Sequence, residues 1–114
     1  MSTISTHVLD TARGKPAGDV PVRLEREEGP ERWKLVGAGR TDPNGRCGPL
    51  LGAGEKLSAG NYRLVFDTKA YFAAQKIEGL YPLVQVQFAV AEDESHYHIP
   101  LLLSPNGYTT YRGS

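Results

Sequence analysis

Three histidines and one arginine are the side chains of this sequence best suited to move protons and to hold an anion. His7, His96 and His98 are the only histidines among 114 residues, and imidazole is the side chain whose unperturbed pKa lies between pH 5 and 8. Arg46 follows an Asn-Gly turn and carries a planar, permanently charged group that can hold a flat anion or a developing oxyanion. Each of these residues taken alone is more often structural or solvated. They suggest acid–base chemistry only if the fold gathers them.

Two other kinds of site deserve comparison. His96 and His98 are two residues apart and would share one face of a strand, and His7 could be the third ligand of a catalytic zinc ion. No carboxylate or cysteine stands at ligand spacing nearby, so the sequence disfavours a metal. Nucleophilic catalysis is disfavoured too, because no Gly-x-Ser-x-Gly turn occurs and Cys47 lacks an activating signature.

The composition limits the partners and the compartment. Thirteen basic and thirteen acidic side chains give a formal net charge of zero, so bulk charge would not draw the chain to nucleic acid or to an anionic membrane. We therefore expect a small molecule or another copy of the chain as partner. Cys47 is the only cysteine, the first residues do not read as a secretory signal, and no apolar run approaches a membrane span of roughly 20 residues. These features predict a cytoplasmic protein.

The elements that would position these residues are mostly strands. Thirteen glycines and eight prolines separate short segments rich in Val, Leu and Tyr, a pattern typical of antiparallel β proteins. One helix is expected over 68–75, with Asp67 as its N-cap. The whole chain, 1–114, is predicted to be a single all-β domain, a two-sheet β-sandwich with one short helix. Strands are expected over 4–9, 20–27, 33–39, 60–66 and 83–91, followed by a closing hairpin that begins near residue 96.

The first strand of the closing hairpin has two different faces. Alternation predicts that Tyr97, Ile99, Leu101 and Leu103 point into the core. The opposite face carries His96, His98, Pro100 and Leu102 and would suit the wall of a cleft or a subunit contact. Because Pro100 cannot donate to a strand ladder, the strand is expected to lie near an edge or a rim of its sheet.

Four stretches of the sequence together resemble one family. They are residues 6–17 (THVLDTARGKPA), residues 41–46 (T-x-x-x-G-R), residues 98–105 (HIPLLLSP) and the ending Tyr111-Arg112-Gly113-Ser114. The sequence resembles the 5-hydroxyisourate hydrolases, also called transthyretin-related proteins, over nearly its whole length. The terminal tetrapeptide and the HxPLLLSP run are highly specific in a chain of this size.

The resemblance implies a transthyretin-like sandwich of two four-stranded sheets, assembled as a homotetramer with its active sites in a central channel. It implies hydrolysis of 5-hydroxyisourate, the product of urate oxidation, to 2-oxo-4-hydroxy-4-carboxy-5-ureidoimidazoline without a cofactor or metal. His7, Arg46 and His98 would be catalytic, the two histidines moving protons while Arg46 holds the anionic oxygen. Which histidine is the base stays open. Substrate would be bound by His7, Arg46, Tyr111 and Ser114.

Two non-enzymatic functions compete with hydrolysis. Transthyretin has the same fold and carries a hormone, but a carrier channel has no use for paired imidazoles and lacks the enzyme's His7, Arg46, His98 and Tyr-Arg-Gly-Ser end. An adhesion or scaffold module is also compatible with the composition. Such a module would show no turnover, and changing His7 or His98 would not affect its function.

Overall fold

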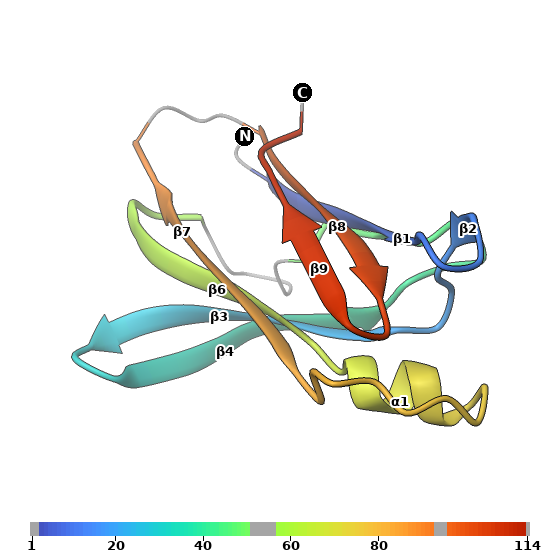
Figure 1. The fold of residues 1–114 in the computed structure, drawn as a ribbon. Coiled ribbons are helices and arrows are strands. Elements are labelled where there is room, and N and C mark those ends of the chain that lie inside the picture. Colours follow the sequence, from blue (N-terminus) through green and yellow to red (C-terminus); the bar gives the residue numbers. More distant parts are fainter. Residues whose placement is uncertain (1–2, 51–56, 93–95, 114) are drawn as a thin grey trace.

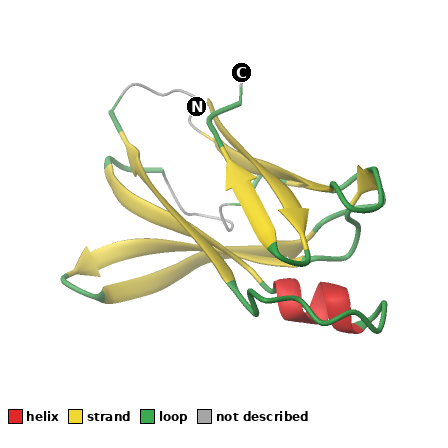
Figure 2. Ribbon diagram, in the orientation of Figure 1, coloured by secondary structure: helices red, strands yellow, loops and turns green. Residues whose placement is uncertain are grey.

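Two β-sheets face each other and enclose one hydrophobic core (Figure 1). The computed structural model describes residues 3–50, 57–92 and 96–113. The expected two-sheet sandwich is confirmed, and α1 (Thr68–Ala73) is the one helix among these residues (Figure 2).

The first sheet is built around the pairing of a strand from the start of the chain with a strand from its end. β1 (Thr3–Asp10) runs parallel to β8 (His96–Ser104) along its whole length, from Thr3 opposite His96 to Asp10 opposite Leu103. Three short strands complete this sheet: β2 (Lys15–Pro16) and β5 (Arg46–Cys47) pair with β1, and β9 (Gly107–Thr110) pairs with β8. The resemblance implied four strands here, and the structure has a fifth because two residues of β5 join β1.

The second sheet has four antiparallel strands. Their order is β4 (Arg32–Arg40), β3 (Pro21–Gly29), β6 (Gly60–Phe66) and β7 (Val84–Val90). Val22 and Leu24 are buried while Arg23 between them is exposed, so side chains at the start of β3 alternate between the core and the solvent, as expected for a strand with one buried face.

The helix lies at one end of the sandwich, beneath the end of β6 (Figure 1). Asp67 is its N-cap, because the side chain accepts a hydrogen bond from the Ala70 amide, as the sequence predicts. The helix is two residues shorter than expected, since residues 74–76 form a turn and Lys76 has a φ of 59°. Among the described residues, no helix has the length and apolar character needed to cross a bilayer.

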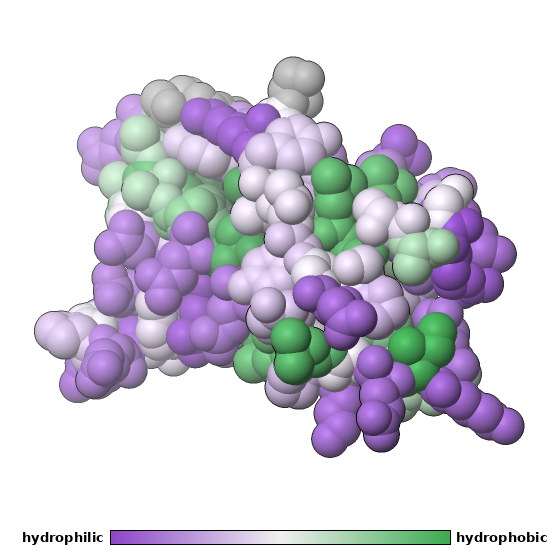
Figure 3. Space-filling model, viewed as in Figure 1, coloured by the Kyte–Doolittle hydropathy of each residue, from purple (hydrophilic) through white to green (hydrophobic). Residues whose placement is uncertain are grey.

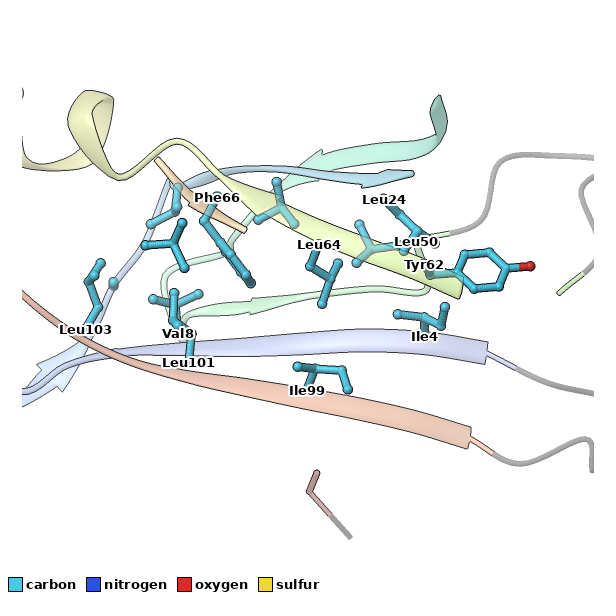
Figure 4. Close-up of a cluster of buried hydrophobic side chains, with 14 of the residues drawn as sticks. Ile4, Val8, Leu24, Leu50, Tyr62, Leu64, Phe66, Ile99, Leu101 and Leu103 are labelled. Carbon is cyan, nitrogen blue, oxygen red and sulfur yellow. The ribbon is translucent and has the colours of Figure 1, made fainter. Parts of the chain in front are cut away.

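The core side chains come from both sheets and point toward one another (Figure 4). Burying one large apolar side chain contributes about 1.5–3 kcal/mol before chain entropy is counted, so this cluster supplies the main stabilisation of the sandwich. The first sheet contributes Ile4, Val8, Tyr97, Ile99, Leu101 and Leu103, and the second contributes Leu24, Tyr62, Leu64 and Phe66. The predicted core face of β8 is therefore confirmed.

β8 lies near an edge of its sheet, as expected, but it is not the edge strand itself. β8 lies between β1 and β9, so it has a hydrogen-bonded neighbour on each side. Pro100 is tolerated there because β9 ends at Thr110, which pairs with Leu101, so Pro100 lies one residue beyond that ladder. The backbone N–H that Pro100 lacks is therefore at a position where β9 has already ended.

A few apolar side chains remain exposed beside the helix. Figure 3 shows hydrophobic residues over this end of the visible face. Ile77, Leu80 and Leu83 follow α1 and are 38%, 65% and 41% exposed. The catalytic candidates do not belong to this region, because they lie on the outer face of the first sheet.

Candidate active site

A tight turn brings Arg46 next to His7. The turn spans residues 42–45, where the Asp42 carboxylate accepts hydrogen bonds from the Asn44 and Arg46 amides, each at 2.9 Å. Gly45 has a φ of 80° and lies against β1, where the Val8 amide donates to its carbonyl at 2.7 Å. β5 then pairs with β1, with Arg46 directly opposite His7. Directly opposed residues on paired strands present their side chains to the same face.

The parallel pairing of β1 with β8 adds His98 to the same face. Ser5 is opposite His98 in this register, and Ser5 and His7 share a face because they are two residues apart. Ser5 Oγ lies 2.9 Å from His98 Nδ1. The structure therefore gathers His7, Arg46 and His98 on the outer face of the first sheet, although they come from three strands.

A small open cavity of about 160 Å³ lies at this place. Arg46 is exposed, and no carboxylate of the described residues forms an ion pair with it. Its guanidinium is thus available to an anionic ligand. The cavity is lined by Ser5, Thr6, Asp42, Arg46, Cys47, Gly48 and His98.

His7 lies beside this cavity without lining it. Its Nε2 donates a hydrogen bond of 2.8 Å to the carbonyl oxygen of Asn44, so Nε2 carries the proton of the neutral ring. Nδ1 is then the nitrogen of His7 that can exchange a proton. The same turn that presents Arg46 also sets the tautomer of His7.

His98 is the histidine whose protonation the site alters most clearly. It is half-buried, and this burial lowers its pKa from the usual histidine value. The positive charges of His7, His96 and Arg46 lower it further, in that order. The neutral ring is therefore favoured at pH 7, and Nδ1 is the nitrogen that faces Ser5; a neutral ring with its proton on Nδ1 would have Nε2 free to act as a base.

His96 has more contacts than its sequence position indicated. Its Nε2 lies 3.1 Å from Ser5 Oγ, and its Nδ1 is hydrogen-bonded to Thr3 Oγ1. Its ring is nearly parallel to that of His98, with the planes 13° apart. Sequence reasoning missed Ser5, which links the two rings, yet the signal was present: Ser5 stands two residues before His7 and therefore shares its face.

The C-terminal segment approaches His98 through its backbone. The Gly113 amide donates a hydrogen bond of 2.7 Å to the His98 carbonyl. A Cβ atom at Gly113 would lie 2.6 Å from His98 Cδ2, so only glycine allows this approach. This contact is a second feature of the site that sequence reasoning missed.

Tyr111, a predicted substrate-binding residue of the same segment, does not line the cavity. Tyr111 is 54% exposed and lies over a separate depression with Val86 and Phe88. Its predicted role remains a prediction. Ser114 lies outside the described residues.

The three histidines do not converge as metal ligands. Among the residues that the structure describes, no group of three or more His, Cys, Asp or Glu side chains is arranged to hold a metal ion. His7 is turned toward the Asn44 carbonyl, and His96 and His98 are turned toward Ser5. Cys47 lines the cavity, but burial raises the pKa of its thiol, which keeps it in the less nucleophilic form.

Comparison with known families and structures shows which family the chain belongs to. The HIUase/Transthyretin family matches residues 4–113. The chain belongs to this family. Among its relatives, a 5-hydroxyisourate hydrolase of Mus musculus is 44% identical over 114 residues, covering 99% of this chain and 96% of the relative. Another from Caulobacter vibrioides is 45% identical over 118 residues and covers all of both chains.

Solved structures of family members have the same fold. The 5-hydroxyisourate hydrolase of Klebsiella pneumoniae is 39% identical, covers all of both chains and superposes with a TM-score of 0.85. Transthyretin from Sparus aurata is 33% identical, covers 97% of this chain and 96% of its own, and gives a TM-score of 0.89. The curated relatives confirm the predicted enzyme class, a hydrolase, whereas fold similarity alone would not separate enzyme from transthyretin.

Proposed function

We propose that this family member hydrolyses 5-hydroxyisourate during urate degradation, with His7, Arg46 and His98 as its catalytic residues. The observation that carries the proposal is the convergence of two imidazoles and one guanidinium from β1, β5 and β8 beside one cavity. The relatives that are 44% and 45% identical are 5-hydroxyisourate hydrolases, which supports the same substrate here.

The reaction requires a base, an oxyanion stabiliser and a proton donor. His98 would take a proton from water through Nε2, since the lowered pKa keeps its ring neutral. The resulting hydroxide attacks a ring carbonyl, and Arg46 stabilises the negative charge that develops on the carbonyl oxygen. When the C–N bond breaks, the nitrogen takes up a proton, which His7 would supply from Nδ1 in its imidazolium form and regain from solvent after each turnover. No metal or cofactor enters this scheme.

A second copy of the chain would complete the site. The cavity is open on the outer face of the sheet, whereas hydrolysis of a chosen bond is favoured where bulk water is excluded. A homotetramer that places two such faces together would cover the substrate within a central channel. In that assembly Tyr111 and the C-terminal segment could contact substrate bound by a neighbouring copy.

The proposal is tested with freshly made 5-hydroxyisourate, whose absorbance decays spontaneously. The purified protein should accelerate this decay. His98→Asn and His7→Asn should each lower kcat/KM by about 10²- to 10⁴-fold, the usual contribution of a general acid or base, while circular dichroism shows an unchanged fold. Decay at the spontaneous rate with the unmodified protein would refute the enzyme assignment and would favour a carrier or scaffold.

Arg46→Lys examines the anion contact separately. Lysine keeps the charge but loses the planar, two-pronged donor, so kcat/KM should fall. An unchanged kcat/KM would mean that the shape of the guanidinium does not matter to the reaction.

A further inference from the structure

A chain of hydrogen bonds leads from His98 to the surface of the protein. Ser5 Oγ lies 2.9 Å from His98 Nδ1 and 3.1 Å from His96 Nε2. The other ring nitrogen of His96 is bonded to Thr3 Oγ1. His98 is half-buried and His96 is exposed, so the chain connects the cavity with solvent.

The single proton of the serine hydroxyl can point toward His98 or toward His96, and only the second arrangement leaves His98 able to act as a base through Nε2. If Ser5 donates to His96 Nε2, it must accept from His98 Nδ1–H, and the Nδ1–H of neutral His96 then donates to Thr3. Every donor has an acceptor in this arrangement. It leaves a lone pair on His98 Nε2, which is the form that a base requires.

We propose that Ser5 and His96 form a relay that carries the proton taken up by His98 out to solvent. The proposal rests on the function proposed above, with His98 as the base. The proton from water binds His98 Nε2, the Nδ1 proton passes to Ser5 Oγ, and the Ser5 hydroxyl proton passes to His96 Nε2. His98 is then neutral with its proton on Nε2, and His96 is an imidazolium that releases its Nδ1 proton to bulk water. Before the next turnover the Nε2 proton of His98 is lost to water, while a proton passes inward from His96 Nε2 through Ser5 to His98 Nδ1 and His96 Nδ1 is protonated again from solvent.

Electrostatics favour movement of the charge in this direction. A positive charge on His98 is opposed by burial and by His7 on β1, His96 on β8 and Arg46 on β5. At His96 the charge would be exposed to water, which stabilises it. Ser5 and His96 touch no substrate in this scheme and act through His98, so they are positioning residues.

His96→Gln separates proton transfer from orientation. The glutamine side-chain oxygen can accept a hydrogen bond from Ser5 but cannot take up its proton. We expect kcat to fall by about 10-fold or more, less than the roughly 10²- to 10⁴-fold loss of a base, with KM unchanged. Added imidazole should restore kcat in proportion to its concentration, because position 96 is exposed. A variant with the kcat of the unmodified protein, or one that imidazole does not rescue, would overturn the relay.

Ser5 is tested by removing and then restoring its hydroxyl. Ser5→Ala should lower kcat with little change in KM, and Ser5→Thr should recover most of it. Thr109→Ala is a matched control, since this hydroxyl belongs to the neighbouring strand and is opposite Leu102. The relay is overturned if Ser5→Ala and Thr109→Ala have equal kcat values.

The tautomer of His98 gives a readout that does not require substrate. Nitrogen-15 NMR of the unmodified protein should show the neutral His98 ring protonated on Nδ1. Ser5→Ala should shift it toward protonation on Nε2, whereas His96→Gln should leave it on Nδ1. A ring protonated on Nε2 in the unmodified protein would refute the direction of the chain. Loss of hydrolysis in the unmodified protein would instead refute the proposed function.

Discussion

His98 combines two properties that are difficult to obtain in one side chain. It lies close to positive groups that would stabilise the negative charge of the proposed reaction, yet it must stay neutral to act as a base. Partial burial meets both needs, since burial disfavours the charged imidazole while Arg46 stays at the surface. The pKa of His98 is therefore lowered by the same surroundings that form the cavity.

The pH dependence follows from the direction of this shift. An ordinary histidine has a pKa of about 6.5, and His98 binds its proton only at lower pH, so kcat/KM should hold as pH falls through 6.5 and decline below it. His7→Gln removes a repelling positive charge and should raise the pKa of His98 in an NMR titration. His96→Gln should raise it less, because His96 is the smaller cause. An unchanged pKa in His7→Gln would contradict this account.

The charged and titratable residues of the site could be predicted from the sequence, but the contacts that hold them in place could not. His7, Arg46 and His98 were identifiable from their chemistry together with the resemblance to a family. The spacing of Ser5 from His7 indicated that the two share a face, but the contacts of Ser5 with His96 and His98 and that of the Gly113 amide were not predictable, because they depend on the parallel register of β1 with β8 and on the path of the last residues. A single sequence does not specify which strands pair.

Among the elements, the turn at residues 42–45 positions both Arg46 and His7. Its Asp42 carboxylate orients the amide of Arg46, and its Asn44 carbonyl binds the ring of His7. The Asp-Pro-Asn-Gly sequence predicted a tight turn because Gly is suited to positive φ. That the turn packs on β1 was not predictable from local sequence.

Two glycines with similar backbone angles test this packing. Gly45 and Gly14 have φ values of 80° and 68°. A Cβ at Gly45 would lie 2.3 Å from the Val8 carbonyl oxygen, while nothing lies within 4 Å of one at Gly14. Gly14→Ala should cost about 1–2 kcal/mol of unfolding free energy, from backbone strain alone, and should keep its activity. Gly45→Ala should cost more than about 3 kcal/mol and should lower kcat/KM.

Urea denaturation of the two variants provides the measurement. Equal losses of stability would show that the turn can move away from β1, contrary to the close packing seen here.

The remaining strands were predicted within a few residues of their bounds, since alternation marks their buried faces. Pro100 correctly indicated a strand near an edge, but the short edge strand β9, which pairs with only part of β8, was not resolved from the hairpin pattern.

At the scale of the whole molecule, the site lies on the face of the first sheet that is turned away from the core. A single chain leaves this face open, whereas the proposed homotetramer would cover it. Light scattering should give four times the chain mass of 12.4 kDa, and activity per chain should fall when dilution dissociates the assembly. A monomer with full activity would refute the shared channel.

The C-terminal segment can be examined in the same experiment. The Gly113 amide holds it against the carbonyl of His98, so residues appended after Ser114 should disturb the site. Full activity in an intact tetramer with such an extension would show that the segment has no close role in catalysis.

The pairing of β1 with β8 also constrains the order in which the chain can fold during its synthesis. β1 must wait for a partner that is 93 residues away, Thr3 being opposite His96, which at ribosomal rates corresponds to roughly 5 to 20 seconds. β3, β4 and β6 are contiguous neighbours and can assemble earlier. The catalytic face is thus completed last, and until then the nascent chain exposes one unpaired strand edge on which chaperones or aggregation could act.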